Sequence, residues 1–225
     1  MTDGAKRDAS SLGSSTFESG LLPMLPNPPE LEQQLLEMQA GAPYCGLGFE
    51  KSRLPSDVHQ QVLDHYRANV SNFRPEDPIS EIETINEKMI PAVYFQDEDF
   101  NAQLSRKLQP MLEEWSSMAL CHSACYGVRV YQRGTYLYSH VDRTETHIIS
   151  AAVCVDHSLD SRWPLFIEDI DGKPHQVDLE PGELVFYEGA RLRHGRPYPL
   201  DGDYYAGIFV HYVPRDPIVP GAPAR

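Results

Sequence analysis

Two short sequences, far apart in the chain, carry the residues that most constrain its fold. His140 and Asp142 flank a single valine, and His194 follows about fifty residues later. Two imidazoles and one carboxylate suit a non-haem Fe(II) site, because they take one face of an octahedron and leave positions open for a co-substrate and O2. The intervening chain must therefore fold back so that the three side chains meet.

The spacing of the first two ligands predicts that they lie at the end of a β-strand. Residues two apart on an extended backbone project to the same side of a sheet, so His140 and Asp142 can bind one ion. His194 must then come from another strand. We expect the other histidines, His147 and His211 among them, to be surface or hydrogen-bonded residues, although these two are on predicted strands that could face the same space.

The region around these residues is a series of short predicted strands. Residues 147–155 are rich in β-branched side chains, which favour an extended backbone. The other predicted strands are 126–131, 163–168, 175–179, 183–187 and 204–212. Turns with Gly and Pro separate them, a pattern typical of a sandwich or jelly roll. We expect the metal at the open mouth of that fold.

The pattern divides the chain into four parts. Residues 1–25 are rich in Ser, Gly and Thr and predict a disordered arm. A helical support region is expected over residues 26–120, and the β core over residues 121–214. The prolines of residues 215–225 predict a tail that pairs with no strand.

Apolar residues at helical spacing indicate the helices of the support region. A short helix is expected over residues 30–40 and a second over residues 56–70. A third stripe covers residues 100–115, where Pro110 predicts a kink or two consecutive helices. We expect these helices to pack on the outer face of the β core.

Further residues around the His-x-Asp pair extend the pattern. They are Arg129-Val-Tyr131, Gly134 and Pro181-Gly182-Glu183. Together with the three ligands they resemble the catalytic half of the Fe(II)- and 2-oxoglutarate-dependent dioxygenases, nearest to the prolyl-4-hydroxylase-like branch. The resemblance covers roughly residues 126–214. It implies a mainly β fold with flanking helices and a double-stranded β-helix core, also described as a jelly roll or cupin-like fold.

The resemblance also implies a reaction. His140, Asp142 and His194 match the iron ligands of the family and would be both metal-binding and catalytic. Fe(II), 2-oxoglutarate and O2 would be the cofactors of a hydroxylase, with ascorbate as a stimulating reductant. Desaturation or cyclisation at the same iron site is an alternative, and so is a non-catalytic jelly-roll binding module. Asp142 stands where the similar halogenases have Gly or Ala, which argues against halogenation.

The basic residue that holds the far carboxylate of 2-oxoglutarate in this family is displaced here. It would follow the distal histidine by about nine to eleven positions, where residues 203–205 are Asp, Tyr and Tyr. A buried dicarboxylate needs a cation. Arg196, two residues beyond His194, should point to the same side and is the first candidate, with Arg129 the second. The other predicted co-substrate contacts are Tyr204 and Tyr131.

Three aromatic residues are candidates for lining a substrate pocket, with packing in the core as the alternative. They are Tyr136, Tyr138 and Trp163. Because no binding module is appended, we expect a small molecule, a free amino acid or a short peptide as the substrate. The sequence carries no indication of the oligomeric state.

Composition excludes several other classes. A formal net charge of −14 disfavours nucleic acid, whose binding depends on neutralising phosphates. No apolar run is long enough to cross a bilayer, and no secretory signal precedes the four cysteines, which also lack a CxxC spacing. We expect a soluble, cytoplasmic protein with reduced thiols that binds neither nucleic acid nor membranes.

Overall fold

The computed structural model describes residues 29, 46–75 and 92–216. The predicted arm over residues 1–25, the helix predicted over residues 30–40 and the tail beyond residue 216 lie outside the described residues. Within them, none of the helices combines the length and apolar character needed to cross a membrane.

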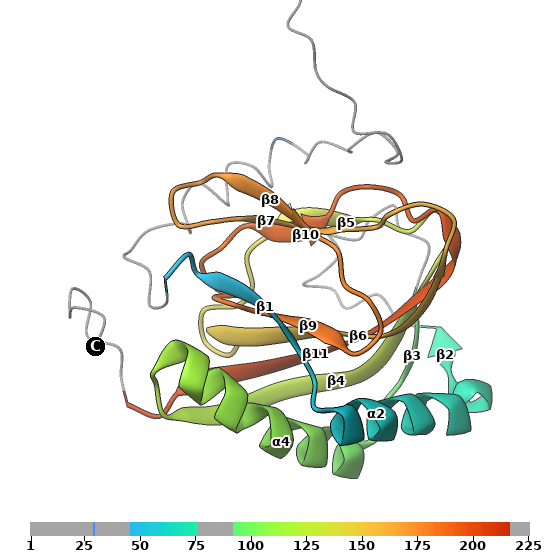
Figure 1. The fold of residues 1–225 in the computed structure, drawn as a ribbon, viewed down its shortest axis with the longest axis horizontal. Helices are drawn as coiled ribbons and strands as arrows, with labels where there is room; N and C mark the ends of the chain where they lie inside the picture. Colours follow the sequence, from blue (N-terminus) through green and yellow to red (C-terminus); the bar gives the residue numbers. More distant parts are fainter. Residues whose placement is uncertain (1–28, 30–45, 76–91, 217–225) are drawn as a thin grey trace, which may run out of the picture.

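Two antiparallel sheets lie face to face, with a space between them that side chains fill (Figure 1). In spatial order, the seven-stranded sheet consists of β1 (Phe49–Arg53), β9 (Glu183–Tyr187), β6 (Ile149–Leu159), β11 (Gly202–Pro214), β4 (Leu120–Gln132), β3 (Val93–Phe95) and β2 (Arg74–Pro75). The four-stranded sheet consists of β5 (Leu137–His140), β10 (His194–Arg196), β7 (Leu165–Glu168) and β8 (Pro174–Val177). From β4 onward the chain alternates between the sheets, except at the β7–β8 hairpin. This confirms the predicted double-stranded β-helix.

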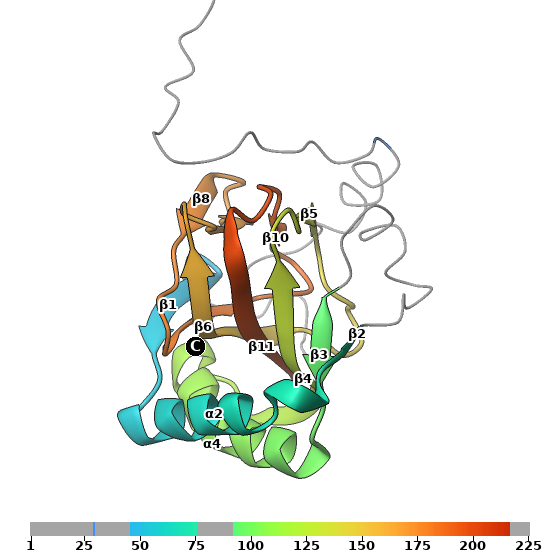
Figure 2. The same cartoon turned by 90° about the vertical axis from the view of Figure 1, so that its right-hand side faces the viewer.

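The helices α2 (Ser56–Ala68) and α4 (Glu98–Ser116) lie side by side on the outer face of the larger sheet (Figures 1 and 2). A 3₁₀ turn, η1 (Val70–Asn72), follows α2. The Asp97 carboxylate caps α4 by accepting a hydrogen bond from the Phe100 backbone N–H, at 3.0 Å. Pro110 lies inside α4, which continues past it as one helix. Of the two predicted outcomes at Pro110, two consecutive helices do not form.

The larger sheet separates two hydrophobic clusters. The outer cluster fills the space between this sheet and the helices, where Leu108 and Leu112 of α4 are fully buried. The inner cluster lies between the two sheets and is richer in aromatic residues, such as Tyr131 and Trp163. Successive residues of a strand project to opposite faces, so β4, β6, β9 and β11 each contribute to both clusters.

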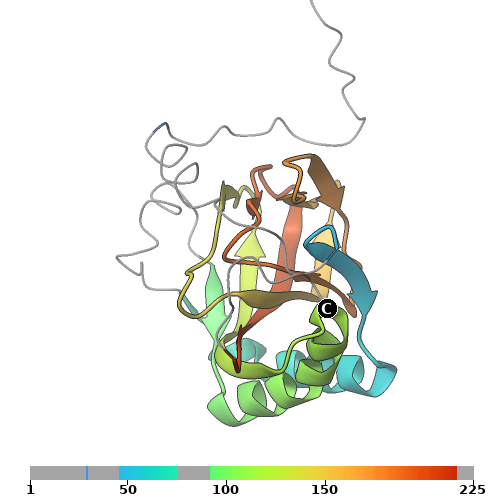
Figure 3. The ribbon, with the colours of Figure 1, turned by 90° about the vertical axis from the view of Figure 1, so that its left-hand side faces the viewer.

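Residues before the β core also contribute strands. β1 pairs with β9 at one edge of the larger sheet, where Figure 3 shows it in blue, and β3 pairs with β4 at the other. The apolar patterns did not indicate these strands, because β2 and β3 are only two and three residues long and β1 has a single apolar residue, Phe49. Strand pairing also extends β4 and β11 beyond the predicted ranges, across interruptions in register.

Candidate metal centre

The three predicted ligands meet between the two sheets. His140 ends β5, His194 begins β10, and the two are paired opposite each other in the smaller sheet. The Asp142 Oδ1 lies 3.7 Å from the His140 Nε2 and 3.6 Å from the His194 Nε2. Their ligand atoms all lie within 4.8 Å of one another. Within the described part of the chain, this is the one such group of His, Cys, Asp or Glu that could hold a metal ion.

The two histidines share a face because they pair directly, and a bulge in β5 lies next to this pair. His194 pairs with His140, whereas Arg196 pairs with Leu137, so one strand advances three residues while the other advances two. Between these pairs, a Cβ at Gly195 would lie 2.6 Å from a backbone carbonyl oxygen of β5. A side chain does not fit there. The glycine after the distal histidine therefore permits the close approach of the bulged part of β5.

Backbone carbonyls orient both imidazoles. The Nδ1 of His140 lies 2.8 Å from the Tyr138 carbonyl oxygen, and the Nδ1 of His194 lies 2.8 Å from the Leu192 carbonyl oxygen. Because a carbonyl only accepts, each Nδ1 must carry the proton. The lone pair of each Nε2 is then directed toward Asp142 and available to a metal ion.

The Asp142 carboxylate is held ionised by its surroundings. Burial alone would raise its pKa, but the imidazoles around it, His194 first, more than offset burial and hold the pKa well below the usual range. Its Oδ2 is buried and lacks a hydrogen-bond partner among the described residues. The carboxylate packs on Gly189, where a Cβ would overlap it. A buried, ionised oxygen without a partner fits a bound cation.

The pKa values of the two histidines shift in opposite directions. Burial lowers the pKa of His140 to about 4, assisted by the charge of His194, so His140 is neutral at pH 7. For His194, burial also lowers the pKa, but the Asp142 carboxylate outweighs it and the net shift is upward. Burial therefore dominates at His140, and the carboxylate dominates at His194. The donor set as a whole, two Nε2 atoms and one carboxylate, suits a divalent transition metal.

Sequence reasoning assigned no role to several residues that the structure places around the triad. The ring centroids of His147 and His211 lie 3.7 Å apart, and the His211 Nδ1 is 4.0 Å from the Asp142 Oδ2. Ser150 contacts the same His211 nitrogen at 2.8 Å. The ring of Tyr187 lies against that of His194, with centroids 4.6 Å apart. The predicted strands at His147 and His211 already allowed these two histidines to face the site, whereas no sequence pattern indicated Ser150 or Tyr187.

Arg196 points into the space between the sheets, as predicted, and is 3% exposed. Its Nη2 donates to the Tyr205 hydroxyl at 2.8 Å, and its Nη1 donates to the Trp163 carbonyl. The guanidinium carbon lies 4.2 Å from the Tyr205 ring centroid and 4.5 Å from that of Trp163. Two aromatic rings therefore hold the guanidinium in place.

The structure corrects the prediction for Tyr204. Its hydroxyl donates to the Asp156 Oδ2 at 3.1 Å, and its ring packs with the outer cluster, on the far side of the sheet from the triad. Tyr205, one residue later, faces inward. Alternation along β11 decides between the two neighbours, so Tyr205 replaces Tyr204 as the hydroxyl beside Arg196.

The other predicted contacts lie on β4. Tyr131 is buried in the inner cluster, with its ring centroid 5.4 Å from that of Trp163. Arg129, two residues earlier, lies with its guanidinium carbon 5.5 Å from the Tyr126 ring centroid. Arg129 pairs with Gly207 of β11, a position without a side chain.

The three predicted pocket residues separate into two places. Trp163 belongs to the inner cluster, and its indole N–H donates to the Tyr198 carbonyl oxygen at 2.6 Å. Tyr136 and Tyr138 form an edge-to-face pair beside the smaller sheet, with centroids 5.2 Å apart. Tyr138 packs with Val141, apart from the inner cluster. The structure therefore brings Trp163, and not this pair, to Arg196.

Among known proteins, similarity to this chain was found in solved structures and not in sequences. No family model matches the sequence, and no curated protein is similar to it. A prolyl-4-hydroxylase from Pseudomonas putida has a similar structure, with a TM-score of 0.55, 17% identity, and coverage of 75% of this chain and 94% of that chain. The non-haem α-ketoglutarate-dependent epimerase SnoN of nogalamycin biosynthesis gives a TM-score of 0.57 at 13% identity, covering 85% and 95%.

A third similar structure was solved with ligands. HygX from Streptomyces hygroscopicus, with nickel, 2-oxoglutarate and hygromycin B bound, gives a TM-score of 0.54 at 13% identity and covers 84% of this chain and 88% of that chain. The protein thus has the double-stranded β-helix fold of the prolyl 4-hydroxylases and other 2-oxoglutarate-dependent oxygenases, with a His-Asp-His triad in it.

Proposed function

We propose that this protein is a non-haem Fe(II) oxygenase that couples decarboxylation of 2-oxoglutarate to hydroxylation of a small molecule, a free amino acid or a short peptide. The observation that carries the proposal is the triad: two Nε2 atoms, each 3.6–3.7 Å from one buried carboxylate oxygen, within an oxygenase fold. The nickel and 2-oxoglutarate in HygX support the same ligand classes here.

The residues of the chain would hold and shield the reacting groups. His140, Asp142 and His194 would bind the metal and leave its other positions open. A bound Fe(II) would supply, with 2-oxoglutarate and O2, the oxidising power for breaking an unactivated C–H bond. The inner aromatic cluster would keep bulk water away from the site, which protects a reactive site from side reactions.

Arg196 is the proposed anchor for the far carboxylate of 2-oxoglutarate. Its described partners are a carbonyl and a hydroxyl rather than a carboxylate, so its buried charge remains for an anion to neutralise. A guanidinium has five N–H donors, and these bonds use two of them. Arg196 is two residues after His194 in the chain. The side chains of Tyr205 and Trp163 fix the plane of its guanidinium group. Tyr205 and Tyr131 lie on neighbouring strands as further hydroxyl groups.

An anaerobic titration with Fe(II) and 2-oxoglutarate tests the proposal. The wild-type protein should develop the weak visible charge-transfer band of the iron–2-oxoglutarate chelate, and the His194→Ala variant should not. A wild-type protein without the band would be a jelly-roll binding module rather than an oxygenase. Mass spectrometry of candidate amino acids, peptides and metabolites should then show a gain of one oxygen together with succinate. A loss of two hydrogens would instead favour desaturation or cyclisation.

A further inference from the structure

The two oxygens of the Asp142 carboxylate have different neighbours. Oδ1 lies 3.6–3.7 Å from the Nε2 atoms of both ligand histidines and would face a metal ion. Oδ2 is buried, lacks a hydrogen-bond partner among the described residues, and lies 4.0 Å from the His211 Nδ1. The carboxylate therefore has one oxygen for the metal and one that faces the protein.

Ser150 and His211 lie beside this second oxygen. Ser150 is fully buried on β6, and His211 is 4% exposed on β11. The two residues are paired directly opposite each other in the larger sheet, and the Ser150 Oγ lies 2.8 Å from the His211 Nδ1. The register of the sheet thus fixes this pair of side chains next to Asp142.

Gly189 leaves the room in which Asp142 and Ser150 approach each other. A Cβ at Gly189 would overlap the Asp142 Oδ2 and would lie 2.6 Å from the Ser150 Oγ. The Asp142 backbone N–H also donates to the Gly189 carbonyl oxygen at 2.8 Å, which fixes the start of the Asp142 side chain. The two side-chain oxygens therefore border the same small space, which only a glycine leaves open.

The charge of Asp142 orients the hydrogen atoms of the Ser150–His211 pair. If the Ser150 hydroxyl donated to Nδ1, the serine lone pairs would face a carboxylate, which only accepts. If the His211 Nδ1–H donates to the Ser150 Oγ instead, the hydroxyl hydrogen is left to point toward Oδ2. The second arrangement is favoured, and it directs a row of donors from His211 through Ser150 to Asp142.

Tyr187 is the alternative donor to this carboxylate. Its ring lies against that of His194. Burial raises the pKa of Tyr187 well above its usual value and the Asp142 charge adds to the shift, so the hydroxyl keeps its proton. Removal of the Tyr187 hydroxyl is therefore the comparison that separates its role from that of Ser150.

The number of oxygens that Asp142 gives to a metal decides what else can bind there. Two imidazoles and one carboxylate oxygen take one face of an octahedron. In the proposed function, 2-oxoglutarate takes two of the remaining positions and leaves one for O2. Carboxylates can also bind a metal through both oxygens. Such a carboxylate would fill the last position.

We propose that Ser150, supported by His211, is a positioning residue that holds Oδ2 and keeps Asp142 bound to the metal through Oδ1 alone. The proposal rests on the proposed function and explains how its last coordination position stays open. Ligating carboxylates are commonly held by hydrogen bonds of this kind. Ser150 would act through Asp142 and would touch neither the metal nor the substrate.

Relaxation of water protons with Mn(II) in place of Fe(II) tests this without turnover. Mn(II) accepts the same types of ligand, and it relaxes the protons of a water molecule bound to it. With saturating 2-oxoglutarate, the wild-type protein should keep an exchangeable water on Mn(II). Ser150→Ala and His211→Phe should lose most of the relaxation per bound Mn(II), without weaker Mn(II) binding. His211→Asn keeps an N–H donor near the place of Nδ1 and should retain the relaxation.

The matched control is His122→Phe, at an exposed histidine of β4, and it should have no effect. Wild-type relaxation in both Ser150→Ala and His211→Phe would overturn the proposal. So would a loss confined to Tyr187→Phe, because the role would then belong to that hydroxyl. A loss in His211→Asn equal to that in His211→Phe would show that His211 acts through its shape, which also contradicts the proposal.

The same experiment separates this proposal from the proposed function. Failure of the wild-type protein to bind Mn(II), or to form the charge-transfer band with Fe(II) and 2-oxoglutarate, would overturn the proposed function itself. Normal binding of both, with equal relaxation in every variant, would overturn the positioning role alone. If His211→Phe does not fold, Ser150→Ala decides, since it removes a single oxygen atom from the core.

Discussion

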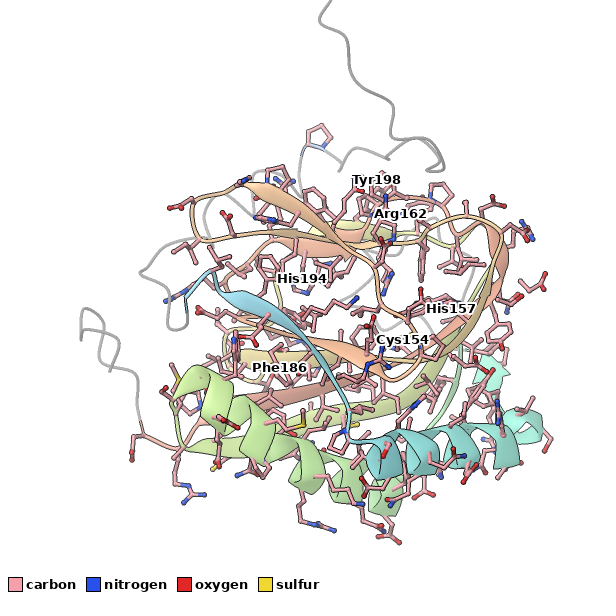
Figure 4. All side chains as sticks on the ribbon, viewed as in Figure 1. Cys154, His157, Arg162, Phe186, His194 and Tyr198 are labelled. Carbon is pink, nitrogen blue, oxygen red and sulfur yellow. The ribbon has the colours of Figure 1, made fainter. Side chains whose placement is uncertain are left out.

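The two faces of the larger sheet have different compositions and different roles. Along β11, Ile208 and Val210 project outward into the outer cluster, which the helices cover, whereas Tyr205 and His211 project inward to the site. Figure 4 shows the same division, with Phe186 on the helix side and His194 between the sheets. One strand thus serves both stability and chemistry, because its side chains alternate between faces.

This division follows from the energetic cost of the site. Burying ionisable groups such as Asp142 and Arg196 lowers stability unless each has a partner. The outer cluster supplies the compensating burial of apolar surface, with Leu108 and Leu112 fully enclosed. Substitutions on the outer side should therefore change the free energy of unfolding, and substitutions on the inner side should change binding.

The largest expected effect is at the triad. His194→Ala should lower metal affinity and 2-oxoglutarate turnover by more than about 100-fold, since loss of a group that merely supports a ligand typically costs 10–100-fold. The melting temperature of the metal-free protein should change little. His122→Ala, at an exposed histidine of β4, is the control. Wild-type activity in His194→Ala would show that His194 is not a metal ligand.

Next is the outer cluster. Leu108→Ala should reduce the free energy of unfolding by about 2–5 kcal/mol, because it leaves a cavity between α4 and the sheet. Metal affinity, measured per folded molecule, should stay at the wild-type value. The control is Leu47→Ala, at a leucine that is 53% exposed. A large drop in metal affinity in Leu108→Ala would contradict the separation of the two faces.

An intermediate effect is expected at the proposed 2-oxoglutarate anchor. Arg196→Gln should raise the apparent KM for 2-oxoglutarate about tenfold or more, as the loss of charge-assisted bonds worth about 1.5–3 kcal/mol implies. Fe(II) binding should remain close to normal. Arg129→Gln is the comparison and should leave this KM unchanged. The reverse pattern would move the anchor to Arg129.

The smallest effect is at the cap of α4. Asp97→Ala removes the acceptor of the Phe100 N–H and should lower the free energy of unfolding by about 1 kcal/mol. Turnover should not change, because α4 lies on the outer side of the sheet. Asp97→Asn keeps a capping oxygen and should retain most of the stability. A change in KM in Asp97→Ala would show that the outer side also shapes the site.

Local sequence pattern predicted α2, α4, the main strands of the β core and the triad. The His-x-Asp spacing, the distal histidine and the period of two in the strands were sufficient for the fold class and for the inward direction of Arg196. The apolar stripe also placed α2 within two residues of its observed end at Ala68. These features were predictable because each depends on residues that are close together in the chain.

Only the tertiary structure decided how distant segments meet. It placed His140 opposite His194 beside a bulge in β5, chose Tyr205 over Tyr204, and brought together Tyr126 of β4, His211 of β11 and His147 from the segment before β6. It also added β1 to the sheet beside β9. Register and pairing depend on the packing of many side chains at once, and a shift of one residue reverses every face. The sequence by itself therefore determined which residues could do chemistry, and the pairing of strands determined which of them lie together.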